Sequence, residues 1–156
     1  MLGVVQCSID SATGVEHLRK LCCLELSYCP RLEDITPLAR LSDGLLELEL
    51  DHCKKIPDLT FLRCLRRLRK LIVSDCGEVA TLGFIKAMTD LEFLSFVGTN
   101  VLDGDMTPCF NLKYAGFMNK RHYSHTFEEV EAKIAEPAGK GSDLNDGFNS
   151  SKKGQS

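Results

Sequence analysis

The nine residues Leu21–Cys29 read LCCLELSYC, and the same pattern returns twice further along the chain. Leu45–Cys53 reads LLELELDHC, and Leu68–Cys76 reads LRKLIVSDC. A fourth row, Leu91–Thr99 (LEFLSFVGT), has Thr in the place of Cys, and a fifth begins at Leu112. The row starts are 24, 23, 23 and 21 residues apart. A repeat of this length predicts a solenoid, in which each row forms one coil.

The fifth row is degenerate, because Leu112, Ala115 and Phe117 keep the apolar spacing while Lys120 stands at the Cys position. Within each row, the alternation L-x-L is typical of a short strand that turns its leucines towards a core. A single coil cannot bury its apolar side chains alone, so we expect its stability to come from stacking on its neighbours.

The second half of each row places apolar residues every three positions, a spacing that predicts a 3₁₀ or similarly tight return segment. These residues are Leu32, Ile35, Leu38 and Leu41, then Ile56, Leu59, Leu62 and Leu65, then Val79, Leu82, Ile85 and Met88. In the fourth row Asp105 falls at an apolar position and Met106 is shifted by one. We therefore expect that return segment to be irregular.

The rows resemble leucine-rich repeats of the short type, with Cys at the turn and a return such as Leu32–Leu38 (LEDITPL). The resemblance covers residues 18–120. It implies an α/β solenoid: a horseshoe with one short parallel strand per coil, mostly 3₁₀ or irregular return segments, and a C-terminal capping helix. It also implies a protein-binding scaffold without chemistry or a cofactor of its own.

Composition limits the remaining choices. The chain has 156 residues, enough for one domain, which excludes a multidomain enzyme. Its net charge of -3, from 19 Lys and Arg against 22 Asp and Glu, is too balanced for a purely electrostatic nucleic-acid binder. No apolar run reaches the length of a membrane span, and residues 1–10 lack the basic start of a secretory signal. We therefore expect a cytoplasmic protein that binds no membrane.

The eight cysteines are not expected to form a disulfide framework. Cys29, Cys53 and Cys76 occupy one equivalent position in successive rows, so their side chains should stack in parallel and point the same way. We expect them to be buried and reduced, because a reduced Cys behaves as a small apolar residue.

The two ends of the chain differ in their signals. Residues 1–20 should form an N-terminal cap or an irregular first coil, in which Leu2, Val5 and Cys7 echo the strand spacing. The repeats span 21–125. Thr126 and Glu129 form a capping box, which predicts a capping helix over 126–136. The tail 137–156 should be disordered. An irregular start would favour a fragment, and a capped end would favour a true C-terminus.

The outward-facing strand residues should line the concave face in columns, and we take these as the candidate partner-binding residues. They are Glu25, Tyr28, Glu47, Glu49, Asp51, His52, Lys70, Ile72, Asp75, Phe93, Ser95, Val97, Tyr114 and Met118. The first half of this face is acidic. In the second half, Ile72, Phe93, Val97, Tyr114 and Met118 should form one apolar patch, and a contiguous apolar patch usually marks an interface.

Other motifs favour structural roles. The basic run Arg63–Lys70 interleaves with core leucines and holds no aromatic residue to stack bases, which argues against nucleic acid. His122 and His125 offer two metal ligands where zinc requires three or four. Adjacent residues of a strand face opposite sides of the sheet, so Cys22 and Cys23 are no better candidates for a metal site. No catalytic motif is present, so we predict neither an enzyme nor a metal site.

Two functions remain open. The first is a non-catalytic module that binds one protein through its concave face, in a specific form an inhibitor or immunity-type protein acting on a basic toxin, effector or enzyme. The second is a regulatory subunit or a sensor-arm fragment of a larger signalling protein.

Overall fold

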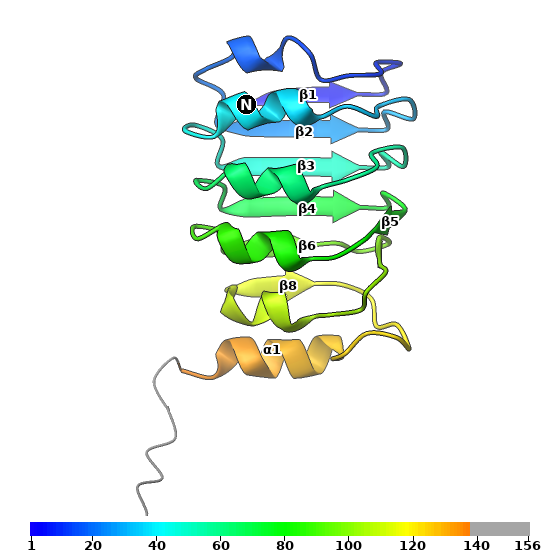
Figure 1. Cartoon of the computed structure of the whole chain (residues 1–156), viewed down its shortest axis with the longest axis vertical. Helices are drawn as coiled ribbons and strands as arrows, with labels where there is room; N and C mark the ends of the chain where they lie inside the picture. Colours follow the sequence, from blue (N-terminus) through cyan, green and yellow to red (C-terminus); the bar gives the residue numbers. More distant parts are fainter. Residues whose placement is uncertain (138–156) are drawn as a thin grey trace, which may run out of the picture.

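The computed structural model describes residues 1–137 as a stack of coils, each with a strand on one side and a short helix on the other (Figure 1). The strands form one parallel six-stranded sheet in the order β1-β2-β3-β4-β6-β8. Their bounds are Leu2–Val5 (β1), Cys23–Ser27 (β2), Glu47–Asp51 (β3), Lys70–Ser74 (β4), Phe93–Ser95 (β6) and Tyr114–Gly116 (β8). The predicted solenoid, with one short parallel strand per coil, is confirmed.

The opposite layer consists of the return segments, which are 3₁₀ helices as the spacing of three predicts. They are Val15–His17 (η1), Thr36–Leu41 (η2), Thr60–Cys64 (η3), Gly83–Ala87 (η4) and Thr107–Asn111 (η5). A second, two-stranded parallel sheet joins β5 (Glu78–Val79) to β7 (Asn100–Val101). One α-helix, α1 (Phe127–Ala135), follows β8. None of the helices within residues 1–137 has the length and apolar character that crossing a membrane requires.

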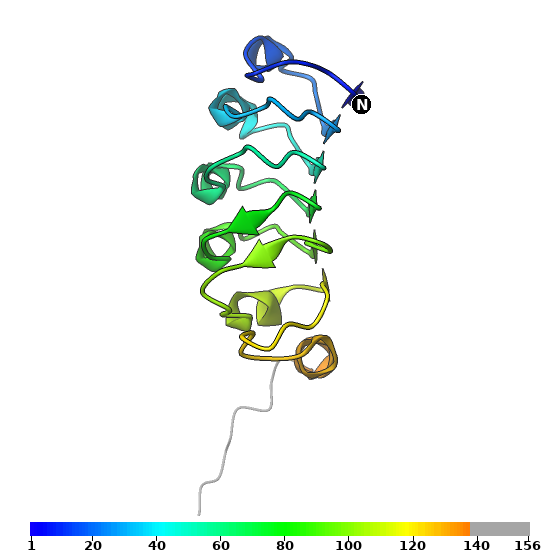
Figure 2. The same ribbon diagram turned by 90° about the vertical axis from the view of Figure 1, so that its right-hand side faces the viewer.

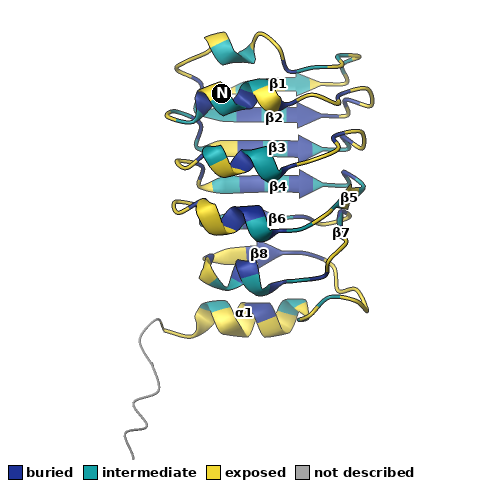
Figure 3. Cartoon of the chain, viewed as in Figure 1, coloured by how far each residue is buried: buried dark blue, intermediate teal, exposed yellow. Residues whose placement is uncertain are grey.

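Buried residues occur both on the strands and on the 3₁₀ helices (dark blue in Figure 3), and they form one core between these two layers. The register pairs Leu24 with Leu48 and Leu48 with Leu71, so the inward side chains of each strand lie over those of the next. All three leucines are buried. Each leucine thus contacts the equivalent leucine one coil away, which is the packing that the sequence repeat encodes.

Three of the return segments begin beside a carboxylate that satisfies free backbone groups. Asp58 accepts hydrogen bonds from the backbone N–H and the hydroxyl of Thr60, at 2.8 and 2.6 Å. Asp34 and Asp105 do the same for the Thr two residues later. These bonds from Thr hold the pKa of all three carboxyl groups below the usual Asp value.

The expected irregularity of the last return segment is wrong. Met106 is fully buried and stands at the N-cap of η5, as Leu82 does for η4. Asp105 does not face the core, because it caps Thr107. The different residue spacing of this row is accommodated before η5 begins. There Gly104 has a positive φ of 68°, and the backbone carbonyl of His122 lies where a side chain at 104 would be.

Buried thiols form a ladder along the turns. The Cys53 thiol lies 3.3 Å from the carbonyl oxygen of Leu26, and the Cys76 thiol lies 3.4 Å from that of Leu50, each one coil earlier. The Thr99 hydroxyl donates to the equivalent carbonyl at 2.6 Å. Burial raises the pKa of the Cys76 thiol to about 12. Thr99 therefore replaces Cys without loss of the bond between coils.

The first coil departs from the expected arrangement in two residues. Leu2 and Val4 pair with Leu24 and Leu26 and turn inward, whereas Val5 is 53% exposed, so the strand spacing runs through Leu2 and Val4 rather than through Leu2 and Val5. Cys7 lies beyond β1, after Gln6, which has the same positive φ as Tyr28, His52 and Asp75 before the ladder cysteines. Cys7 therefore holds the position of the ladder cysteines in the first coil, which was not predicted, and its thiol lies 3.8 Å from the Val5 carbonyl oxygen of the same coil.

The C-terminal helix closes the far end of the stack (Figure 2). Thr126 accepts a hydrogen bond from the backbone N–H of Glu129, and the Glu129 carboxylate accepts from the N–H of Thr126, so the predicted capping box is present. Val130 is fully buried, and α1 contacts both β8 and η5. The predicted tail 137–156 lies outside the described residues from 138 onwards.

Candidate partner-binding face

The outward side of the six-stranded sheet, here called the strand face, carries its side chains in three columns fixed by the register. The first column is Cys23, Glu47, Lys70, Phe93 and Tyr114. The second is Gly3, Glu25, Glu49, Ile72, Ser95 and Gly116. The third runs through Val5, Ser27, Asp51 and Ser74. Neighbours in a column lie on strands about 4.8 Å apart, so their side chains form one continuous surface.

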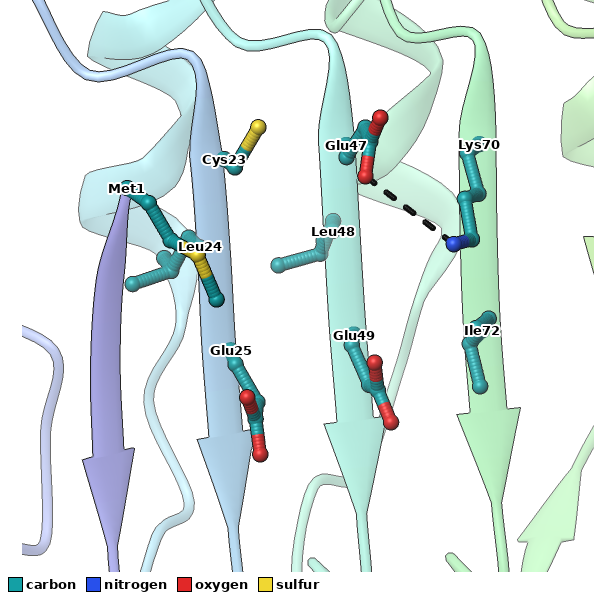
Figure 4. A pocket seen from close by; sticks show the side chains of 9 residues that line it. All are labelled: Met1, Cys23, Leu24, Glu25, Glu47, Leu48, Glu49, Lys70 and Ile72. Carbon is teal, nitrogen blue, oxygen red and sulfur yellow. Dashed lines mark ion pairs between the residues drawn. The ribbon is translucent and has the colours of Figure 1, made fainter.

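The half of the strand face over β2 and β3 is acidic. Glu25 pairs with Glu49 in the register, and Figure 4 shows both side chains projecting from the same side of the sheet. The Ser27 hydroxyl donates to Glu25 at 2.9 Å. Burial raises the pKa of Glu49, and the negative charges of Glu25 and Asp51 raise it further. The positive charge of Lys70 lowers this pKa but does not cancel the rise. Two carboxylates directly opposite each other repel, so a cation placed between them would be stabilised.

The only cation within the columns of this face is Lys70, as far as residues 1–137 are concerned. Its Nζ lies 3.9 Å from a carboxylate oxygen of Glu47 and 5.7 Å from the centre of the Phe93 ring. Neither Glu25 nor Glu49 forms an ion pair within the described part of the chain. Lys70 therefore marks the boundary between the acidic half and an aromatic half.

The aromatic half is built from β6 and β8. The rings of Phe93 and Tyr114 stack with their centroids 4.6 Å apart and their planes 15° apart, and Tyr114 is 43% exposed. The Tyr114 ring lies over Gly116, where a Cβ would come within 2.9 Å of the Tyr114 hydroxyl oxygen. Glycine at 116 is thus what allows the Tyr114 ring to lean along its own strand over residue 116.

The other residues of the expected apolar patch lie apart from this pair in the register. Ile72 occupies the second column between Glu49 and Ser95. Val97 and Met118 follow the last residues of β6 and β8, and both are exposed. The structure thus brings Phe93 and Tyr114 into contact, while the other three lie one column away or beyond the ends of β6 and β8.

Three predicted strand-face residues lie instead at the corner that follows each strand, so their expected position was wrong. Tyr28, His52 and Asp75 come directly after β2, β3 and β4 and have φ angles of 54°, 52° and 50°. This left-handed conformation turns the chain into the return segment. The rings of Tyr28 and His52 stack at 4.3 Å.

The corner also brings together a group of ligand atoms that was not expected from the sequence. His52 Nδ1 lies 2.7 Å from an Asp51 carboxylate oxygen, and Nε2 lies 4.0 Å from one of Asp75. One ligand atom from each residue lies within 4.8 Å of the others. Three ligands at a partly exposed corner fall short of a closed zinc site, and we assign no ion to them. The sequence repeat could have revealed this group, because His52 and Asp75 hold equivalent positions in successive rows and Asp51 directly precedes His52.

The two histidines weighed as metal ligands make separate contacts. His122 Nε2 lies 2.8 Å from the carbonyl oxygen of Val101, and His125 packs edge-on against Phe110 with ring centroids 5.0 Å apart. Both belong to the loop that leads into α1.

The basic run keeps its charges away from the core. Arg66 and Arg67 are exposed, while Leu65 and Leu68 on either side of them are fully buried. The leucines of this run therefore serve the fold, and the arginines lie on the turn between η3 and β4.

Comparisons with known proteins identify the fold. No protein-family model matches the sequence, and no curated protein does. Among solved structures, internalin C2 from Listeria monocytogenes superposes with a TM-score of 0.50 at 25% identity, over 72% of this chain and 58% of that protein. A second internalin from the same organism gives a TM-score of 0.49 at 24% identity, over 74% of this chain and 42% of its own.

The parallel strands, the 3₁₀ returns and the likeness to internalin C2 together define the class: this chain is a leucine-rich repeat protein. The chain spans 58% of the length of internalin C2. A scaffold of this class indicates, in general terms, a protein–protein interaction module.

Proposed function

We propose that the strand face binds one protein partner that presents basic side chains beside an apolar surface. The observation that carries this proposal is the exposed Phe93–Tyr114 stack, which lies on the same sheet face as the opposed carboxylates of Glu25 and Glu49. One surface therefore offers both an aromatic anchor and a place for a cation. The proposal assigns no catalytic step to the chain.

The acidic half would act mainly on encounter. Glu47, Glu49 and Asp51 lie on one strand, and Glu25 adds a fourth carboxylate from the neighbouring strand. A field of one sign attracts an oppositely charged partner and raises its association rate, more strongly at low salt. A Lys or Arg that enters between Glu25 and Glu49 would also relieve their repulsion.

The aromatic half would hold the partner once it has docked. Stacked aromatic side chains bury a large area at a small cost in side-chain entropy, and residues of this kind dominate binding energy at interface centres. Lys70 lies near Phe93 and leaves Tyr114 as the exposed partner of the stack. We therefore expect Tyr114 to lose the most accessible area on binding.

In its specific form, the proposal is an inhibitor or immunity-type protein that neutralises a basic toxin, effector or enzyme in the cytoplasm. An acidic surface without catalytic groups suits the blocking of a basic active site. The thiol ladder supports a reducing compartment, because Cys53 and Cys76 donate the hydrogen bonds between coils as thiols.

A comparative pull-down tests the proposal. Wild-type protein, a Phe93→Ala and Tyr114→Ala double variant, and an Arg66→Ser and Arg67→Ser control are each used to capture proteins from the native host for mass spectrometry. The proposal requires a protein captured by the wild type and the arginine control and lost with the aromatic variant. Loss only with the arginine control would place binding on the outer turns and refute it.

Surface plasmon resonance with the captured protein then separates the two halves. Substituting Glu47, Glu49 and Asp51 by Ser should slow association, and the difference from wild type should shrink as salt is raised. The aromatic double variant should dissociate faster, at a cost of about 2 kcal/mol or more. Equal rates for the wild type and both variants would contradict the assignment.

A further inference from the structure

Two neighbouring thiols, those of Cys22 and Cys23, lie side by side where the chain enters β2. Cys22 directly precedes the strand and Cys23 is its first residue. Leu21 and Leu24 on either side are buried, whereas both cysteines are partly exposed. The two sulfur atoms lie 3.8 Å apart. The expectation that these cysteines face opposite sides was therefore wrong, because strand alternation does not yet apply to a residue before the strand.

The backbone holds the pair in this arrangement. The carbonyl oxygen of Cys22 accepts hydrogen bonds from the N–H groups of Leu46 and Glu47, at 2.8 and 3.0 Å. The carbonyl oxygen of Leu46 accepts in the same way from Arg69 and Lys70 in the next coil. This double bond to the following coil belongs to the repeat, so the peptide group that joins the two cysteines is fixed by the stack.

The other cysteines are engaged in different ways. Four of them are buried, namely Cys29, Cys53, Cys76 and Cys109. Cys64 is partly exposed, but its thiol lies 2.8 Å from the carbonyl oxygen of Phe61. Within residues 1–137, the hydrogen bond of the Cys23 thiol is to the sulfur of Cys22. Cys22 and Cys23 therefore form an accessible dithiol whose sulfur atoms face each other.

The distance between the two sulfur atoms selects the kind of atom that could join them. Two thiolates bonded to one centre at about 2.3 Å lie about 3.8 Å apart at a tetrahedral angle and about 4.6 Å apart in a line. A disulfide requires about 2.05 Å, so forming one would displace the side chains. The observed 3.8 Å fits a single bridging atom in a bent geometry.

The surroundings decide how many further ligands such an atom could find. No third Cys, His, Asp or Glu among residues 1–137 places a ligand atom within 4.8 Å of both thiols. Zinc takes three or four protein ligands and is therefore a poor match. A trivalent arsenical with one organic substituent, R–As(OH)₂, needs only two thiolates because R supplies the third bond. We propose that Cys22 and Cys23 form a dithiol site that binds trivalent organic arsenicals of this kind.

The binding step is an exchange of ligands. Each thiol replaces one hydroxyl group, so two As–S bonds form and two As–O bonds break, and each thiol proton leaves with its hydroxyl group as water. Arsenic stays trivalent, and no oxidant is required. Partial burial raises the pKa of the Cys23 thiol, and the neighbouring Cys22 raises it further. The pair is thus kept protonated, which disfavours attack on peroxides because the thiolate is the nucleophile.

The bound arsenical would lie at one end of the strand face. Cys23 is the first member of the first column and pairs with Glu47 in the register (Figure 4). The substituent R would therefore project beside the acidic half of that face. The site does not depend on the proposed protein partner, because the two thiols alone supply the bonds.

Mass spectrometry of the intact protein with phenylarsine oxide tests the site. This probe hydrates to the required dihydroxide with a phenyl group as R. Reduced wild-type protein should take up one phenylarsenic group and lose two titratable thiols. The adduct should survive a large excess of a monothiol, because two bonds within one molecule are lost only together. Ethanedithiol, which also offers two thiols, should release it.

Single substitutions identify the thiols. Cys22→Ser and Cys23→Ser should each abolish the adduct that resists the monothiol. The matched control is the double variant Cys7→Ser and Cys64→Ser, which removes the other two partly exposed thiols and should keep the adduct. Peptide mapping of the wild-type adduct should place the phenylarsenic group on the peptide that contains both neighbouring cysteines.

Urea unfolding separates binding to the folded protein from capture of the unfolded chain. The two single variants should unfold at the wild-type midpoint, and the probe should leave the wild-type midpoint unchanged or raise it. A lower midpoint with the probe would mean that the unfolded chain binds it better, which overturns the proposal. The proposal also fails if no adduct resists the monothiol in the wild type, or if both single variants keep it.

Discussion

The two ends of the solenoid finish the same repeat in opposite ways. At the C-terminal end, α1 covers the last coil with Val130 fully buried and a complete capping box. At the N-terminal end, η1 has no side-chain cap, and Leu2, Val4 and Val15 stay partly buried. The difference teaches that each coil provides only one side of a coil–coil interface. Covering the exposed side of the last coil requires an element with a different sequence pattern, here α1.

The largest effect should come from placing a charge at each end. Val130→Asp buries a carboxylate without a partner and should cost roughly 3–5 kcal/mol in the free energy of unfolding. Val5→Asp, the same change at the open end, should cost less than about 0.5 kcal/mol. Urea unfolding measures both. Similar losses at the two sites would show that the ends do not differ in closure.

The thiol ladder gives a smaller contrast. Cys53 is fully buried in the interior of the stack, whereas Cys7 is half-buried in the first coil. Cys53→Ser should destabilise the fold by about 1–3 kcal/mol, because serine lacks both the large sulfur atom and the methyl group that Thr99 has, so it fills the buried site less well with a more polar group. Cys7→Ser should cost less than about 0.5 kcal/mol. Equal costs in urea unfolding would mean that the first coil is as tightly packed as the third.

Removing the N-cap of α1 should cost about 1 kcal/mol more in the free energy of unfolding than a substitution beside η1. Thr126→Ala removes the side chain that accepts from the N–H of Glu129, and loss of an N-cap usually costs about that much. Thr13→Ala, next to the uncapped η1, should change the melting temperature little. Thermal unfolding of both variants tests this. An unchanged melting temperature for Thr126→Ala would show that packing alone holds α1.

The smallest effect concerns acid. The Thr bonds lower the pKa of Asp34 and of Asp105 in the folded state, so their contribution is present above the unfolded Asp pKa and is lost as pH falls through the folded one. Asp105→Asn and Asp34→Asn should each flatten the fall in stability below about pH 4. Urea unfolding at a series of pH values measures this slope. A slope equal to that of the wild type would show that these caps do not contribute to acid sensitivity.

The repeat made the fold predictable in detail. Leu24, Leu48 and Leu71 hold equivalent positions in the rows, and their spacing alone gives the strand register. The period of three gave the 3₁₀ returns, and Thr126 with Glu129 gave the start of α1. These features depend on local pattern and on stacking of equivalent residues, which one sequence contains.

The candidate site was predictable only in part. The sheet register could be derived, so Glu25, Glu49, Phe93 and Tyr114 were assigned to one face. The left-handed corner at Tyr28 was missed because positive φ is uncommon at residues other than glycine, asparagine and aspartate. Cys7 was missed because the first coil lacks the leucine pattern that marks the other rows.

The connections between coils also decide how the molecule would respond to force. Each coil hydrogen-bonds only to its neighbours, so tension along the solenoid axis loads the strand pairs and the thiol ladder in series. Between the coils of β4 and β6, the β5–β7 sheet adds the pairs Glu78–Asn100 and Val79–Val101. A pull from both ends should therefore peel off the coils of β1, β2 and β3 one after another and pause where this second sheet begins, which makes the C-terminal half the mechanical clamp of the chain.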